Sequence, residues 1–260
     1  MIYIQRISNY LRNLIYAKLF ALPNSMKSIV FFLKDLIQYN RMRTKKNILS
    51  DINFYPCIAD RTTETLFDRH YTYFPAWAMR KILDYKPKLH IDISSSLHFC
   101  TMLSAVIKTE FYDFRPAKIK LSNLITKQAD LTNLPFEDNS IKSLSCMHVI
   151  EHIGLGRYGD KIDPQGDQSA AKELIRVLSP GGRLLIVVPV GKDVVMFNAH
   201  RIYSLKSVKH LFRSLKLVES YLIPEKQGID PIMNPTSLEI SRENYSCGCF
   251  MFRKEVSHVR

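Results

Sequence analysis

Two aspartates stand at the ends of short apolar segments, where a carboxylate could bind the hydroxyls of a nucleotide. Asp92 lies in "HIDISSSLHF" (residues 90–99), and Asp113 follows 21 positions later. An acid about 20 residues beyond a nucleotide-binding turn accepts hydrogen bonds from a ribose. The turn after Asp92 holds Ser94, Ser95 and Ser96, where such turns are normally rich in glycine. The sequence therefore indicates either a nucleotide site with altered contacts or one that has lost its ligand.

Further polar residues follow three later apolar segments. Asp130 opens "DLTNLPFED", His148 opens "HVIEHIGLGRYGD", and "NAHRIYS" spans residues 198–204. The carboxyl ends of parallel strands meet at one edge of a sheet, and ligands bind there. We therefore expect all five segments to contribute to a single site.

Alternating strands and helices must position these residues. The patterns predict strands at 89–93, 109–113, 124–128, 141–149 and 183–189, and helices at 96–108, at 169–178 and after Ser204. Two last strands, near 217–223 and 245–253, follow each other without a clear helix between them, which favours an antiparallel pair at one edge. This order is typical of an α/β fold with a largely parallel sheet and helices on both faces.

Composition limits the class of protein. A chain of 260 residues with 46% apolar content fits one α/β domain and an extension. Its longest apolar runs have four or five residues, too short for a membrane span, and we expect no secretory signal. The five cysteines are an odd number without disulfide spacing, which favours a cytoplasmic location. Cys247 and Cys249 alternate along a late strand and should share one face.

The basic charge is concentrated near the N-terminus. Residues 1–46 hold nine basic side chains and one acid, a net charge of +8, and this leaves +5 of the total of +13 for the remainder. The spacing predicts two amphipathic helices, within 1–20 and over 26–39, broken by "LPNS" at 22–25. We assign 1–60 as a basic helical extension and 61–260 as the main domain. The helices could dock on the inner face of an anionic membrane, cover the main domain or form a dimer contact.

Two motifs resemble a known family. "LPFEDNSIKSLSCMHVIEHI" and "ELIRVLSPGGRLLIVVPV" are similar to class I S-adenosylmethionine (SAM)-dependent methyltransferases of the type 11 group, over residues 85–223. The run from "HIGLGRYGD" to "NAHRIYS" further resembles an uncharacterised bacterial branch associated with genes for surface polysaccharides such as capsules. The resemblance implies a Rossmann-like fold, with a seven-stranded, mostly parallel sheet and an antiparallel last strand.

The resemblance also implies a cofactor site. Asp113 would hold the ribose hydroxyls, Asp130 the adenine, and the serine turn the methionine part of SAM. The family pattern Asp-x-Gly-x-Gly-x-Gly is here Asp92-Ile93-Ser94-Ser95-Ser96-Leu97-His98, so no glycine remains. Because SAM has no pyrophosphate to press against the turn, we favour a working site over a dead one. The expected cofactor-binding residues are Asp92, Ser94, Ser95, Ser96, Asp113, Asp130, Leu131 and His148.

The acceptor should bind beyond the fourth and fifth strands. We expect O-methylation of a small polar acceptor, such as a sugar or a nucleotide-linked intermediate, with either His200 or His148 as the base. The expected acceptor-binding residues are Glu151, Arg157, Tyr158, Asp160, Asn198 and Arg201. Some relatives hold a metal on the segment matching 148–152, but we expect none here. The alternatives are an inactive scaffold at a membrane and, less favoured because the charge lies outside the core, an RNA methyltransferase.

Overall fold

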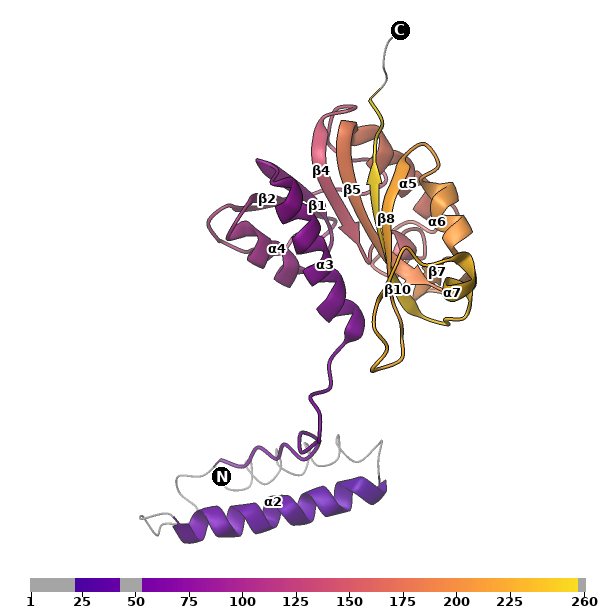
Figure 1. Cartoon of the computed structure of the whole chain (residues 1–260). Coiled ribbons are helices and arrows are strands. Elements are labelled where there is room, and N and C mark those ends of the chain that lie inside the picture. Colours follow the sequence, from indigo (N-terminus) through magenta and orange to yellow (C-terminus); the bar gives the residue numbers. More distant parts are fainter. Residues whose placement is uncertain (1–21, 43–52, 257–260) are drawn as a thin grey trace. The chain divides into compact units, whose positions relative to one another are not determined.

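The computed structural model describes residues 22–42 and 53–256 (Figure 1). The chain divides into two units, Met1–Leu66 and Phe67–Arg260. We call the second unit the α/β domain and describe each unit by itself.

The first unit contains one described helix, α2 (Leu22–Met42). The prediction of a break at 22–25 was wrong, because the helix already begins at Leu22 and takes "LPNS" into its first turn, where proline is tolerated. The extended segment after residue 52 reaches α2 through Arg61, whose guanidinium lies 4.7 Å from the centre of the Phe31 ring. The helix expected within 1–20 lies outside the described residues. Among the described helices, none is long and apolar enough to cross a membrane.

An eight-stranded sheet organises the α/β domain, in the order β3-β2-β1-β4-β5-β10-β8-β9. Strands β1 to β5 pair in parallel, and β10 runs antiparallel to both β5 and β8. The strands are β1 (Leu89–Ile93), β2 (Lys108–Asp113), β3 (Leu124–Gln128), β4 (Ile141–Met147), β5 (Leu178–Val190), β8 (Lys216–Ile223), β9 (Ile232–Met233) and β10 (Ser246–Arg253). The predicted Rossmann-like α/β fold with a reversed last strand is confirmed, and β9 adds a short eighth strand.

Helices cover both faces of this sheet (Figure 1). One face packs against α3 (Arg69–Tyr85) and α4 (Leu97–Ser104). The other packs against α5 (Gly166–Val177), α6 (Leu205–Leu211) and the short α7 (Ser237–Ser241). Alternation along β5 supplies both layers, because Ile186 and Val188 join one core cluster and Leu185 and Val187 the other.

Helix α3 is an element that the sequence patterns did not predict. In "RHYTYFPAW", Phe74 and Trp77 pack inward and are buried, whereas Tyr71 is exposed. The Trp77 indole donates a hydrogen bond to Glu219 Oε1 on β8 (3.1 Å). The Arg69 side chain donates to the carbonyls of Pro224 and Ile229, which fixes the start of the helix.

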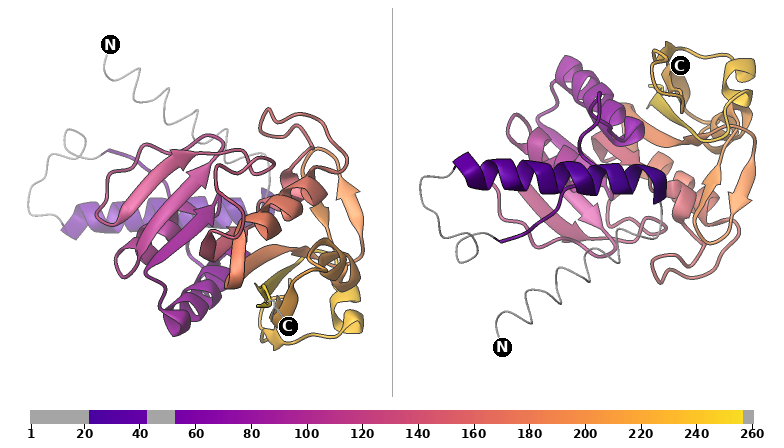
Figure 2. Two further views of the ribbon diagram at one scale, coloured as in Figure 1. Left: turned by 90° about the horizontal axis from the view of Figure 1, so that it is seen from above. Right: turned by 90° about the horizontal axis from the view of Figure 1, so that it is seen from below.

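A second small sheet stands apart from the main one. Strands β6 (Val194–Met196) and β7 (His200–Ile202) form an antiparallel hairpin at the side of the α/β domain (Figure 2). It follows β5 directly, so its residues lie near the end of that strand. The bridge between Val190 and Tyr203 joins the hairpin to β5.

Candidate active site

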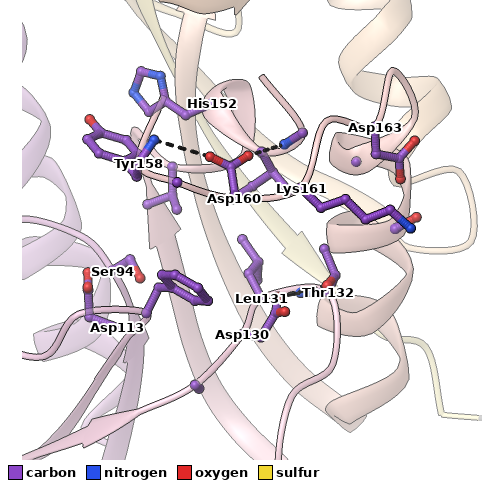
Figure 3. A pocket seen from close by; sticks show the side chains of 18 of the residues that line it. Ser94, Asp113, Asp130, Leu131, Thr132, His152, Tyr158, Asp160, Lys161 and Asp163 are labelled. Atoms are coloured by element: carbon purple, nitrogen blue, oxygen red, sulfur yellow. Dashed lines mark hydrogen bonds between the residues drawn. The ribbon is translucent and has the colours of Figure 1, made fainter. Parts of the chain in front are cut away.

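A cavity of about 680 Å³ lies at the carboxyl ends of the parallel strands (Figure 3). This volume is typical of small-molecule sites. The lining residues come from the end of β2, from the segments after β1, β2, β3 and β4, from the loop 153–165 and from the first turn of α5. They are Ser94, Asp113, Phe114, Arg115, Ala129, Asp130, Leu131, Thr132, His148, Val149, His152, Ile153, Gly154, Tyr158, Gly159, Asp160, Lys161, Asp163, Gly166 and Ser169.

The serine turn keeps a backbone shape that glycine normally provides. Ser94 has a φ of 56°, in the left-handed region, and lines the cavity. Its amide and hydroxyl both donate to the carbonyl of Tyr112, at 2.7 and 3.2 Å. Ser95 accepts from the amide of Met147, and Ser96 is the N-cap of α4. Ser95 and Ser96 thus hold the turn in place and do not line the cavity.

Asp92 is fully buried beneath this turn and does not line the cavity. It accepts hydrogen bonds from the Ser95 amide (3.0 Å) and the Ser145 hydroxyl. Burial raises the pKa of Asp92 to about 6, although these hydrogen bonds oppose the shift. Ser145 is also in contact with His90, whose pKa burial lowers to about 3, so the imidazole is neutral. Asp92 therefore shapes the turn from below.

Asp113 and Asp130 lie on the cavity wall, as the strand order led us to expect. Asp113 accepts through Oδ1 from the amide of Arg115 (2.7 Å), and Asp130 accepts through Oδ1 from the amide and hydroxyl of Thr132. In each carboxylate a local turn fixes one oxygen and leaves Oδ2 for a ligand. Leu131 also lines the cavity.

The loop 153–165 forms the opposite wall and is tied down from within. Asp160 accepts from the amides of Gly154 (2.7 Å), Gly156 and Tyr158. Burial raises the pKa of Asp160, but these amides lower it more, so it lies below the ordinary value. The buried Arg201 side chain donates to the carbonyls of Ile153 and Pro164. Arg201 thus supports the loop and does not line the cavity.

Tyr158 lines the cavity. The guanidinium groups of Arg115 and Arg157 lie 4.8 Å and 5.1 Å from the centre of its ring, in cation–π contact. The edge of the ring contacts His152, which is labelled beside it in Figure 3. Arg157 also donates a hydrogen bond to the carbonyl of Ala199 (3.0 Å). It is not one of the residues that line the cavity.

Both ring nitrogens of His148 are engaged. Nδ1 lies 3.0 Å from Glu151 Oε1, and Nε2 lies 3.6 Å from the sulfur of Cys247. Burial alone would lower the pKa of His148, but Cys247 and Glu151 raise it above the ordinary value. Glu151 is buried and does not line the cavity. His152 instead points one ring nitrogen at the carbonyl of Ala199 (2.6 Å).

The β6–β7 hairpin holds the other candidate base. His200 is partly buried, 6.4 Å from the His152 ring and 4.9 Å from the Tyr245 ring between centres. Burial, followed by the charge of His152, lowers the pKa of His200. Neither His200 nor the exposed Asn198 lines the cavity. His200 of the hairpin is thus in ring contact with His152, which does line the cavity.

Of the expected site residues, those in the lining set are Ser94, Asp113, Asp130, Leu131, His148, Tyr158 and Asp160. The sequence reasoning missed Arg115, Lys161 and Asp163. Arg115 follows Asp113 by two positions, so the rule that site residues follow strand ends could have found it. Lys161 and Asp163 lie in a loop whose path only the tertiary structure reveals.

Comparison with known proteins places the chain in a family. A model described as "Caenorhabditis protein of unknown function, DUF268" matches residues 106–246, more than half of the chain. The chain belongs to this family. The DUF268 match spans β2 to the start of β10 and most of the cavity residues. Its description contains no activity and no link to bacterial polysaccharides, and no curated protein matches the chain.

Solved structures share the fold of this DUF268 protein. The N-methyltransferase NodS from Bradyrhizobium japonicum WM9, in complex with S-adenosyl-L-homocysteine, is 13% identical, with a TM-score of 0.52, covering 85% of this chain and 97% of that one. A candidate sarcosine dimethylglycine methyltransferase from Galdieria sulphuraria (13%, TM-score 0.51) covers 71% and 86%. A candidate methyltransferase from Bacillus halodurans C-125 (13%, TM-score 0.50) covers 68% and 99%. The chain therefore has the fold of these methyltransferases.

Proposed function

We propose that this DUF268 chain is a SAM-dependent methyltransferase. The carrying observation is the cavity of about 680 Å³ at the carboxyl ends of the parallel strands, with Asp113 and Asp130 on its wall. Four carboxylates line it, Asp113, Asp130, Asp160 and Asp163, against the cations Arg115 and Lys161 and against His148, whose pKa is raised to about 10. A cavity with excess negative charge suits a cationic sulfonium ligand.

The residues present fit the cofactor. Asp113 and Asp130 would hold the ribose and adenine through their Oδ2 atoms, since Oδ1 of each is fixed by a turn. Leu131 would pack beside the adenine, and the left-handed Ser94 would bring the backbone close to the methionine part. When bound, SAM supplies an electrophilic methyl group on sulfur and leaves as S-adenosylhomocysteine.

For the acceptor we propose a hydroxyl whose proton is taken by His200. Both nitrogens of His148 are engaged within the protein, whereas the lowered pKa of His200 keeps its imidazole neutral at physiological pH. Tyr158 lines the cavity, Arg157 donates to the neighbouring Ala199 carbonyl, and we propose that both, with Asn198, contact a polar acceptor. The acceptor class we propose is a sugar or a nucleotide-linked intermediate.

Calorimetric titration with SAM and S-adenosylhomocysteine tests the cofactor site. We expect Asp113→Asn to weaken binding by about 10- to 100-fold, because it removes the charge from a hydrogen-bonded carboxylate. Asp138→Asn is the matched control, since Asp138 is exposed and outside the cavity. A folded protein that binds neither ligand would overturn the proposal and favour a scaffold role.

The pH dependence of methyl transfer tests the base. A histidine base acts only when neutral, so the rate should fall as pH drops through the pKa of His200, which lies below 6.5. We expect a flat profile from about pH 7 upward, where an unshifted histidine is already mostly neutral. His200→Gln should remove the acid limb and lower kcat. An unchanged acid limb in His200→Gln would exclude this residue as the base.

A further inference from the structure

Three side chains with metal-ligating atoms converge from separate parts of the α/β domain. His70 comes from the first turn of α3, His148 from the turn after β4, and Cys247 from β10. Their ligand atoms all lie within 4.8 Å of one another. A tetrahedral Zn²⁺ with ordinary bonds to nitrogen and sulfur holds these atoms about 3.6 Å apart. The 3.6 Å between His148 Nε2 and Cys247 Sγ already equals that spacing.

The remaining nitrogen of His148 has an anchor. Its Nδ1 is hydrogen-bonded to the carboxylate of Glu151 (3.0 Å), and the backbone of Tyr245 acts to raise the pKa of His70. Histidines that bind metals nearly always donate their other N–H to a carboxylate or carbonyl, which fixes the ring and its tautomer. His148 thus has the outer contact that is typical of a metal-binding histidine.

The cluster is buried, and an aromatic ring stacks on each histidine. Cys247 is fully buried, and both histidines are largely buried. The Tyr71 ring stacks on His148, with 5.5 Å between ring centres, and the Tyr245 ring stacks on His70 at 5.1 Å. The ligands therefore sit in surroundings from which water is mostly excluded, where a bound ion is held strongly.

Charge balance favours a divalent ion. The carboxylate of Glu151 is buried, and its Oε2 has no hydrogen-bond partner among the described residues. A divalent metal with one thiolate carries a net charge of +1, which Glu151 neutralises. Buried charges are costly unless they are balanced in this way.

We propose that His70, His148 and Cys247 bind one zinc-class divalent metal ion, with Glu151 as the carboxylate that orients His148. On binding, the Cys247 thiol and the protonated His148 imidazole each release a proton to solvent, so that the ligands are one thiolate and two neutral imidazoles. The ion ties α3 and β10 to the turn after β4, where His148 forms part of the cavity wall. This site does not depend on the proposed methyl transfer.

Cobalt titration of the chelator-treated full-length protein tests the site. We expect one equivalent of Co²⁺ to bind with a thiolate-to-cobalt charge-transfer band, and Zn²⁺ to displace it. Cys247→Ala should abolish the band, and His70→Gln should weaken Zn²⁺ binding by at least about tenfold. Cys249→Ala is the matched control, because its sulfur lies only 3.9 Å from that of Cys247, outside the triad, and the band should persist.

Thermal unfolding gives a second measurement of metal binding that does not depend on enzyme activity. Zn²⁺ should raise the Tm of the wild type and of Cys249→Ala, but not that of Cys247→Ala, because a ligand bound only by the folded state stabilises it. Glu151→Gln should lower zinc affinity by about 10- to 100-fold. The proposal is overturned if the wild type shows no charge-transfer band, if Cys247→Ala retains it, or if Cys249→Ala loses it.

Discussion

At the scale of single residues, Ser94 carries the most unusual feature of the site. A side chain in the left-handed region costs about 1–2 kcal/mol relative to glycine. Here the Ser94 hydroxyl offsets part of this cost by its hydrogen bond to the carbonyl of Tyr112. The turn therefore keeps the shape of a glycine turn, although none of its residues is glycine.

Substitutions at Ser94 separate backbone shape from side-chain contact. Ser94→Gly should leave the free energy of unfolding within about 1 kcal/mol of the wild type, because relief of strain and loss of a hydrogen bond nearly cancel. Ser94→Val should lower it by about 2 kcal/mol or more and weaken SAM binding, since a β-branched residue resists this φ. Urea unfolding and calorimetry provide the measurements. A stable, SAM-binding Ser94→Val would contradict the argument from strain.

How far the sequence predicts the site differs from residue to residue. Asp113 and Asp130 were placed correctly at the cavity because the order of strands brings their ends together. The exact neighbours of a buried side chain do not follow from such a pattern. Arg201 has the same charge whether it faces a ligand or supports a loop, and only its hydrogen bonds to Ile153 and Pro164 distinguish the two.

At the scale of elements, the strands were more predictable than the helices. The bounds of β1 and β3 agree with the sequence patterns to the residue. β1 is mostly buried, as expected of a strand inside a parallel sheet, whereas β3 is an edge strand in which only Leu124 is buried. Helix α3 has Pro75 within it, and its first half is rich in aromatic residues, so its local composition does not favour a helix. Tertiary packing of Phe74 and Trp77 holds it, and that packing has no local sequence signature.

The attachment of α3 to β8 can be tested at Glu219. This carboxylate accepts from the Trp77 indole and the Lys81 ammonium group, and all three groups are largely buried. Glu219→Ala should lower the free energy of unfolding by about 1–3 kcal/mol, because it leaves two donors unpaired. Asp138→Ala, which removes an exposed partner of Arg176, should cost only about 0–1 kcal/mol. Equal costs for the two would contradict the assignment of Glu219 as an anchor.

The loop 153–165 should depend on Arg201. Removing the guanidinium in Arg201→Met leaves three carbonyls and the Asp167 carboxylate without this buried partner, and should cost about 3–5 kcal/mol. Limited proteolysis should then cut within the loop faster than in the wild type. Arg157→Met, at an exposed arginine of the same loop, is the control and should change little. Unchanged protection in Arg201→Met would show that other contacts hold the loop.

At the scale of the whole molecule, we expect stability and SAM binding to depend on the α/β domain and membrane binding to depend on the first unit. The described core clusters of the α/β domain run from Phe74 to Phe252 and take no residue from the first unit. Removal of residues 1–66 should therefore leave the free energy of unfolding within about 1 kcal/mol and SAM binding unchanged. A truncated chain that unfolds or loses SAM binding would show that the first unit completes the domain.

The first unit itself should provide membrane affinity. Helix α2 exposes Val30, Leu33 and Ile37 together with the basic residues Lys34 and Arg41. Apolar and cationic side chains on one helix bind anionic lipid surfaces. We expect sedimentation with vesicles of phosphatidylserine and phosphatidylcholine to require residues 1–66 and to weaken with salt. Equal retention on neutral vesicles would contradict a contribution of the basic side chains to membrane binding.

The position of β10 has a consequence for synthesis on the ribosome. This strand is the last of the described strands, yet it lies between β5 and β8 in the sheet, and Phe250 and Phe252 belong to one core cluster. A nascent chain can pair β1 to β5 as they emerge, but the edges of β5 and β8 that face β10 stay unpaired until residue 253 has left the exit tunnel. The sheet thus closes only after β8 and β9 have been synthesised, and a chain that stops short of β10 presents open strand edges that chaperones and proteases recognise.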